Sequence, residues 1–221
     1  MPTNEKLETG LSQLGLEPSA DAIEKLQMYM DLLKEWSRTY NLIAPREREY
    51  LLERHVLDSL TIADSLKPGS LLDVGTGAGL PGIPLAIVKP EMEVTLIDGA
   101  GKKIRFIRHV ARSLPLTNIE PLHQRVEDLK PDQPFANITS RAFASLNEFA
   151  EIVRPLMTEN TQLLAMKGMV PELELEDLPS WIKLDAVKRL EVPGLEVERH
   201  LVIMSLATPI EKAPAEQDAH G

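Results

Sequence analysis

The chain has no cysteine among its 221 residues, and this absence excludes several kinds of chemistry. Without thiols it forms neither disulfides nor thiolate metal sites. It also has no cysteine nucleophile, which attack on a pyrimidine ring carbon would need. The five histidines are not spaced like zinc ligands, so we expect no metal site.

Long apolar runs and a net positive charge are also missing. No segment approaches the roughly 20 apolar residues that cross a bilayer, and residues 1–10 are too polar for a signal peptide. These observations predict a cytoplasmic protein without membrane contact. The net charge of −10 argues, as an average, against a nucleic-acid partner. The hydrophobic content of 43% is sufficient for the core of one domain.

Positive charge is nevertheless concentrated in one segment of the chain. Between Gly99 and Arg125 the only acid is Glu120, while acids collect in residues 172–177 and in the tail. The basic residues of this segment are Lys102, Lys103, Arg105, Arg108, Arg112 and Arg125. A basic face on an acidic protein can bind the phosphates of a nucleic acid. A solvated helix face is the alternative interpretation.

Apolar runs alternate with helical segments after Gly69. Strands are predicted at residues 70–74, 93–97, 117–122, 135–139, 161–166, 181–190 and 200–206, with helices near 101–114 and 145–157. The last two runs have no clear helix between them, which favours an antiparallel pair. We therefore expect an α/β, Rossmann-like fold with a mostly parallel seven-stranded sheet flanked by helices.

Two amphipathic helices are predicted before the sheet. Apolar residues at every third or fourth position predict a helix over 19–40 with a cap near Ser19 or Asp21, and a second helix from about Glu47 to Leu66. We expect residues 1–66 to form a helical extension packed on a core of residues 67–207, as a single structural unit. Residues 208–221 are rich in proline, alanine and charge, which predicts disorder.

The run LLDVGTGAGLPG, residues 71–82, is the most informative part of the chain. An apolar strand ends there in closely placed glycines, which lets backbone approach a bound small molecule. Counted from Gly77, the glycines fit G-x-G-x-x-G with Asp98 at the distance of a ribose-binding acid, a pattern typical of nicotinamide sites. A tight turn that binds no ligand is the third interpretation.

Counted from Gly75, the same run reads Asp-Val-Gly-x-Gly-x-Gly, which is typical of S-adenosylmethionine-dependent methyltransferases. Prolines at positions 81, 84 and 90 interrupt the helix that follows. A pyrophosphate prefers an uninterrupted helix N-terminus, and adenosylmethionine contains no phosphate. We also expect Asp73 to lie beside the positively charged groups of this cofactor.

Polar residues follow the predicted parallel strands, whose carboxyl ends form the ligand edge of such a sheet. Asp98 can accept ribose hydroxyls, and Val126 with Glu127 can cover an adenine and meet its exocyclic amine. Arg141 can bind a carboxylate, a phosphate or a guanine edge. The fourth strand is not followed by the acid-or-Asn, Pro, Pro, aromatic motif that holds exocyclic amines of nucleobases.

These motifs together resemble the RsmG family, also called glucose-inhibited division protein B, of bacterial 16S rRNA guanine-N7 methyltransferases. The similarity covers nearly the whole chain except the tail. It is carried by Trp36, Tyr40–Leu42, Arg54–Ser59, Asp73–Gly82, Asp98 with Gly101–Lys103, Ser140–Ala144, Met166–Gly168 and Glu198–His200.

The resemblance implies methyl transfer from S-adenosylmethionine to N7 of a guanine in 16S rRNA. It implies a cofactor pocket at Gly75, Leu80, Val126, Glu127 and Arg141, to which the strand-end argument adds Gly77 and Asp98. We expect RNA contacts at Lys102, Lys103 and Arg105, with Arg54, Lys167 and Arg199 as further candidates.

No catalytic residue is assigned, because guanine N7 has a lone pair and no proton, so its attack needs no general base. We expect a monomer that acts on naked 16S rRNA, an assembly intermediate or the small ribosomal subunit. An adenosylmethionine-dependent methyltransferase acting on a different RNA, a protein or a small molecule remains an alternative. A nicotinamide reductase and a non-catalytic nucleic-acid binder remain open as well.

Overall fold

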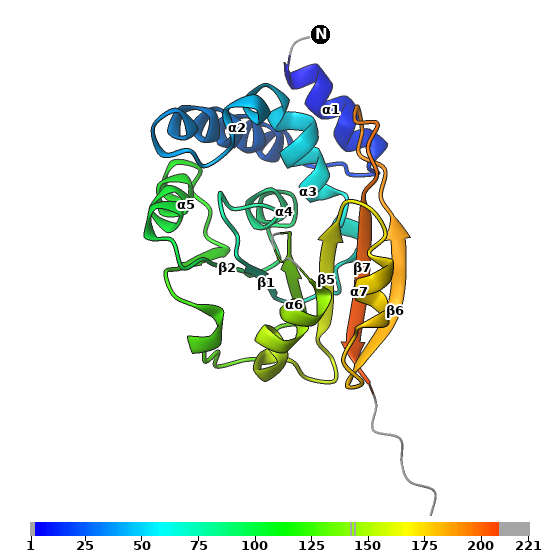
Figure 1. The fold of residues 1–221 in the computed structure, drawn as a ribbon. Coiled ribbons are helices and arrows are strands. Elements are labelled where there is room, and N and C mark those ends of the chain that lie inside the picture. The colour runs from blue at the N-terminus through cyan, green and yellow to red at the C-terminus, as the bar shows by residue number, and fades with distance from the viewer. Residues whose placement is uncertain (1–2, 142, 144, 208–221) are drawn as a thin grey trace, which may run out of the picture.

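The computed structural model describes residues 3–141, 143 and 145–207, which fold around one sheet (Figure 1). Its strands are β1 (Leu71–Val74), β2 (Val94–Ile97), β3 (Ile119–Leu122), β4 (Asn137–Ser140), β5 (Gln162–Lys167), β6 (Ile182–Arg189) and β7 (His200–Leu206). They lie in the order β3-β2-β1-β4-β5-β7-β6. Strand β7 runs antiparallel to both neighbours, and the other pairs are parallel. The predicted Rossmann-like fold and its antiparallel ending are confirmed.

Both faces of the central strands β1, β2, β4 and β5 are buried, and their side chains alternate between two hydrophobic cores. Leu71 and Leu164 pack in the first core, while Leu72 and Leu163 pack in the second. Successive side chains of a strand point to opposite faces. A strand that is covered on both faces therefore reads as a continuous apolar run, as these strands do.

Helices α1 (Thr3–Gln13), α2 (Ala20–Tyr40), α4 (Gly82–Val88) and α5 (Gly101–Ser113) contribute to the first core, and α6 (Leu146–Val153) contributes to the second. Ser19 caps α2, because its side chain accepts a hydrogen bond from the backbone N–H of Ala22 at 3.2 Å. The cap predicted near this position is confirmed. The short helix α7 (Glu172–Glu176) follows β5. No helix in the described residues has the length and apolar character needed to cross a membrane.

The prediction of one continuous helix from Glu47 to Leu66 is wrong. The chain there forms a 3₁₀ helix η1 (Pro45–Tyr50), a π-helix η2 (Leu52–Leu57), a short α3 (Asp58–Leu60) and a 3₁₀ turn η3 (Ala63–Ser65). A π-helical stretch shifts the phase of the side chains and often marks a functional site. A period of 3.6 residues therefore misassigns which side chains of this segment face the core.

Residues on both sides of the predicted domain boundary share the first core, including Leu7, Leu26 and Leu71. The boundary at residue 66 stays a prediction. Residues 208–221, for which the sequence predicts disorder, lie outside the described residues.

Gly82 lies where α4 packs tightly on the sheet. A Cβ atom there would collide with the side chain of Leu96 and lie 2.9 Å from Oδ2 of Asp73. We expect Gly82→Ala to lower the free energy of unfolding by about 1–3 kcal/mol, because overpacking forces neighbouring groups apart. Gly168→Ala is the matched control, since its added Cβ meets nothing within 4 Å. Urea unfolding that gives the same value for both variants would contradict this account of the packing.

Candidate functional site

The glycine-rich loop joins the carboxyl end of β1 to the start of α4. Gly75, Gly77 and Gly79 have φ angles of 67°, 62° and 91°, a region that side chains with a Cβ rarely adopt. The backbone N–H groups of Gly75 and Thr76 donate to the carbonyl of Ile97 at 3.0 and 3.1 Å. The loop therefore folds back against the end of β2, and Gly75 borders a cavity.

Asp73 stabilises this loop from inside the protein through hydrogen bonds. Its fully buried Oδ2 accepts hydrogen bonds from the Thr76 hydroxyl at 2.6 Å and from the Gly82 N–H at 2.9 Å. Burial raises the pKa of Asp73 to about 6, against the lowering effect of these two bonds. The expectation that Asp73 lies beside a cofactor is corrected: its carboxylate is inside the protein and supports the loop that borders the cavity.

Asp98 is the polar residue at the carboxyl end of β2. Its Oδ2 accepts from the Gly77 N–H at 3.0 Å and from Nζ of Lys103 at 3.3 Å, and its Oδ1 accepts from the Ala100 N–H at 2.8 Å. Each carboxylate oxygen has two lone pairs, so Oδ1 can still accept a ligand hydroxyl. Lys103, which was predicted to contact RNA, is here the ion-pair partner of Asp98.

A cavity of about 230 Å³ lies beside the loop, and we call it the glycine-loop pocket. Its lining residues are Val74, Gly75, Ile97, Asp98, Gly99, Gln124, Arg125, Val126, Glu127, Phe143, Glu148 and Ile152. The structure thus brings Gly75, Asp98, Val126 and Glu127 together in one cavity. The side chain of Leu80 packs in the first core instead. Cofactor binding by these residues, by Gly77 and by Leu80 stays a prediction.

Arg141 directly follows β4, and a side-chain bond fixes the end of that strand against β1. The hydroxyl of Ser140 donates to the carbonyl of Val74 at 2.9 Å. Arg141 lines a second cavity, of about 490 Å³, which we call the arginine pocket, while Phe143 lines the glycine-loop pocket. The segment after β4 therefore borders both cavities.

The arginine pocket is lined by Glu47, Arg54, His55, Asp58, Arg141, Met166, Lys167, Gly168, Leu195, Val197 and Arg199. Its charged side chains are four cations and two carboxylates, in a chain whose net charge is −10. Of the residues predicted to bind RNA, Arg54, Lys167 and Arg199 meet here, whereas Lys102, Lys103 and Arg105 lie on α5. The predicted RNA contacts therefore form two separate groups.

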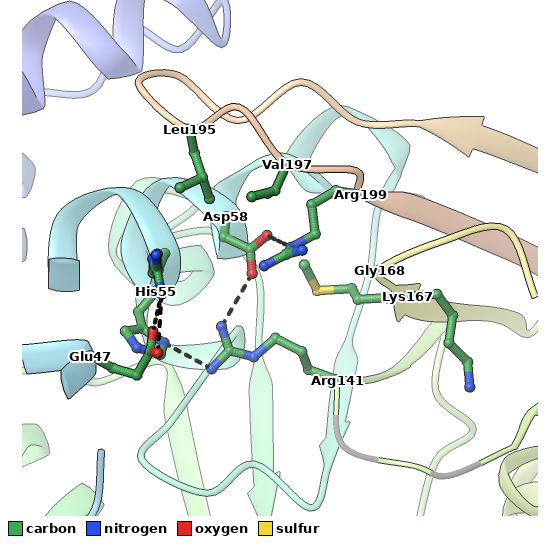
Figure 2. A pocket seen from close by; sticks show the side chains of 11 residues that line it. Glu47, His55, Asp58, Arg141, Lys167, Gly168, Leu195, Val197 and Arg199 are labelled. Atoms are coloured by element: carbon green, nitrogen blue, oxygen red, sulfur yellow. Dashed lines mark hydrogen bonds and ion pairs between the residues drawn. The ribbon is translucent and has the colours of Figure 1, made fainter. Parts of the chain in front are cut away.

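Asp58 joins two arginines within the arginine pocket (Figure 2). Its Oδ2 is 3.3 Å from NH1 of Arg141, and its Oδ1 is 2.9 Å from Nε of Arg199. The side chain of Asp58 is only 4% exposed, against 24% for Arg141 and 29% for Arg199. The carboxylate is thus buried beneath two guanidinium groups that reach the cavity.

His55 is the second partner of Arg141. Its Nδ1 lies 3.4 Å from NH2 of Arg141. A guanidinium only donates, so Nδ1 accepts and the proton of the neutral imidazole is on Nε2. Burial, with the nearby charge of Arg141, lowers the pKa of His55 to about 4. His55 is therefore neutral near pH 7.

Glu47 pairs with Arg54 at the rim of the same pocket. NH1 of Arg54 lies 3.1 Å from both carboxylate oxygens of Glu47, and this hydrogen bond lowers the pKa of the glutamate. Lys167 pairs with Glu174 at 2.7 Å, and its side chain extends away from Asp58 in Figure 2. These two cations are thus partly neutralised.

Sequence reasoning did not assign Glu47, His55 and Asp58 to the site. Asp58 and Arg141 are 83 positions apart, and no local pattern links them. The available signal was the Arg54–Ser59 motif, which carried the family resemblance without a role for each residue. Among the residues that the structure describes, no group of three or more His, Asp or Glu is placed to hold a metal ion.

Solved structures share the fold of this chain at low sequence identity. A SAM-dependent methyltransferase from Aquifex aeolicus matches with a TM-score of 0.54 and 22% identity, over 76% of this chain and 96% of that chain. TrmK from M. capricolum, solved in complex with S-adenosyl-homocysteine, matches with a TM-score of 0.52 and 11% identity, over 70% of this chain and 71% of that one. At these identities the likeness shows the fold alone.

Sequence relatives are far closer. Ribosomal RNA small subunit methyltransferase G of Chromobacterium violaceum is 45% identical over 202 residues, which cover 91% of this chain and 97% of that protein. The protein of the same name from Ectopseudomonas mendocina is 46% identical, over 90% of this chain and 94% of that protein. A sequence model of the family rRNA small subunit methyltransferase G matches residues 22–202. The chain therefore belongs to the rRNA small subunit methyltransferase G family.

Proposed function

We propose that this protein transfers a methyl group from S-adenosylmethionine to N7 of one guanine in 16S rRNA. Family membership supports methylation of small-subunit rRNA. The observation that carries the proposal is the placement of two cavities on one segment: Arg141 lines the arginine pocket and Phe143 lines the glycine-loop pocket. A cofactor in one cavity and a nucleotide in the other would meet beside the end of β4.

The residues of the glycine-loop pocket fit adenosylmethionine, which supplies an electrophilic methyl group on a sulfonium. Oδ1 of Asp98 retains a lone pair for a ribose hydroxyl. Val126 offers an apolar surface to an adenine, and Glu127 follows it in the same cavity. Gly75 lines the cavity without a Cβ atom that would hold a ligand off.

Attack by guanine N7 needs no general base, and His55 in the arginine pocket is a poor one. N7 needs no base, because its lone pair carries no proton, so the protein has to align the reactants. His55 is a poor base at neutral pH, since its pKa is about 4 and its Nδ1 faces Arg141. Arg141 would occupy the nucleophilic lone pair if it donated to N7, so we assign it to O6, to the cofactor or to a phosphate.

We also propose an oligomeric state, a substrate and a cellular location for this reaction. The protein acts as a monomer and without a metal ion, on small-subunit rRNA or a particle that contains it. Such a substrate places it in the cytoplasm. The RNA backbone is bound by the cations of the arginine pocket and by the basic face of α5, where Lys102 and Arg105 are exposed.

Cofactor binding is tested by Asp98→Ala. Loss of this carboxylate removes the acceptor for the ribose and the bond from Gly77 that holds the glycine loop. Hydrogen bonds to a charged group contribute about 1.5–3 kcal/mol, so we expect at least about tenfold weaker binding of S-adenosylhomocysteine in calorimetry. Lys103→Met, which keeps the carboxylate, is the control and should bind nearly as wild type. Wild-type protein that binds NADH and neither adenosylmethionine nor its product would contradict the proposal.

The RNA surface of α5 is tested by the double variant Lys102→Gln, Arg105→Gln. Each lost phosphate contact reduces the slope of log K against log salt by roughly 0.7–0.9, so we expect the slope to flatten by up to about two units. Lys34→Gln with Arg38→Gln, on exposed positions of α2, is the matched control. If both double variants retain the wild-type slope, the phosphates are bound away from α5.

The methylated atom is tested by chemical cleavage. Methylation at N7 fixes a positive charge on the imidazole ring and makes it reducible, after which aniline cleaves the chain. Small-subunit RNA from cells that contain the protein should be cut by borohydride and aniline at one additional guanine. Arg141→Ala should leave that cut weak or absent. A methyl group on a pyrimidine or an adenine, or a pattern that does not depend on the protein, would show that the N7 assignment is wrong.

A further inference from the structure

The two arginines that share Asp58 differ in their other anchors. Arg141 has a second partner on another element, the Nδ1 of His55 at 3.4 Å. Arg199 has only one further hydrogen bond among the described residues, from NH1 to the carbonyl of Glu198, its own neighbour in the chain. The direction of the Arg199 side chain therefore depends mainly on its 2.9 Å bond to Asp58.

Arg199 presents unused donors to the arginine pocket. A guanidinium carries five N–H groups, and Arg199 uses Nε for Asp58 and one N–H of NH1 for the Glu198 carbonyl. The remaining N–H groups belong to a side chain that is 29% exposed and lines the cavity. Such a fork matches the oxygens of a phosphate in a bidentate manner.

The position of Asp58 suits it to hold an arginine rather than to meet a ligand. It begins α3 directly after the π-helix η2, and its side chain is 4% exposed. A buried carboxylate with a guanidinium above it removes much of the rotational freedom of that guanidinium before any ligand arrives. Side chains that are preorganised in this way lose less entropy on binding.

We propose that Asp58 is a positioning residue that directs Arg199 into the arginine pocket, where Arg199 binds a phosphodiester of the RNA substrate. The inference rests on the proposed function, since it needs an RNA in that pocket. It adds a role for Asp58, which acts through Arg199 and does not itself touch the RNA.

The test is a double-mutant cycle on RNA affinity, with Asp58→Asn, Arg199→Gln and the double variant. Dissociation constants for 16S rRNA are measured by filter binding at one salt concentration. We expect Asp58→Asn to weaken binding about tenfold in the wild-type background and less than twofold in the Arg199→Gln background, because its effect passes through Arg199. The exposed Asp64→Asn is the matched control and should leave affinity unchanged. A purely structural role would give the same loss in both backgrounds and would overturn the proposal.

Calorimetry with S-adenosylhomocysteine separates this inference from the proposed function. Asp58→Asn should still bind the product; if it loses product binding together with its cooperative unfolding, Asp58 is a structural residue and the inference is wrong. Arg199→Lys is the second variant, which keeps the charge but not the fork, and we expect at least about fivefold weaker RNA binding. Unchanged affinity for Arg199→Lys would overturn the inference. Failure of wild-type protein to bind the RNA would instead overturn the proposed function itself.

Discussion

The buried carboxylate of Asp73 holds the loop on which the rest of the site depends. Its bonds to Thr76 and Gly82 fix the start and the end of the glycine loop, and the loop in turn donates to Asp98 through Gly77. Burial raises the pKa of Asp73 from 3.8 to about 6. Between these two values the folded state binds the proton more tightly than the unfolded state does, so the contribution of Asp73 to stability falls as the pH rises through this window. The ionised carboxylate thus costs stability near pH 7, where it supports the geometry of the loop.

The residues of the site lie together because they follow the carboxyl ends of parallel strands. Strands β1, β2 and β4 run in one direction, so their carboxyl ends place the glycine loop, Asp98 and Arg141 on the same edge of the sheet. The N-terminal segment completes this edge, because His55 and Asp58 come from the π-helix and from α3. An acidic protein can therefore present Arg141 and Arg199 to a polyanion, since the buried carboxylate of Asp58 partly compensates their charge.

The sequence predicted the elements whose signals are local. Apolar runs placed all seven strands of the described sheet to within a few residues, and the helix cap predicted near Ser19 or Asp21 is Ser19. The segment after Glu47 was misread, because the π-helix breaks the period on which the prediction depended. Asp58 was missed because its partners, Arg141 and Arg199, are 83 and 141 positions away, and pairing at that distance leaves no local pattern.

Under the proposed function, the glycine-loop pocket holds the cofactor and the arginine pocket holds the target guanine, one on either side of the segment after β4. A crystal structure of the protein with S-adenosylhomocysteine and a short RNA that carries the target guanine tests it most directly. We expect the ribose hydroxyls on Asp98, the adenine beside Val126 and the guanine in the arginine pocket with N7 directed at the sulfur. A product molecule bound away from the glycine loop, or a guanine held with N7 directed away from the sulfur, would contradict it.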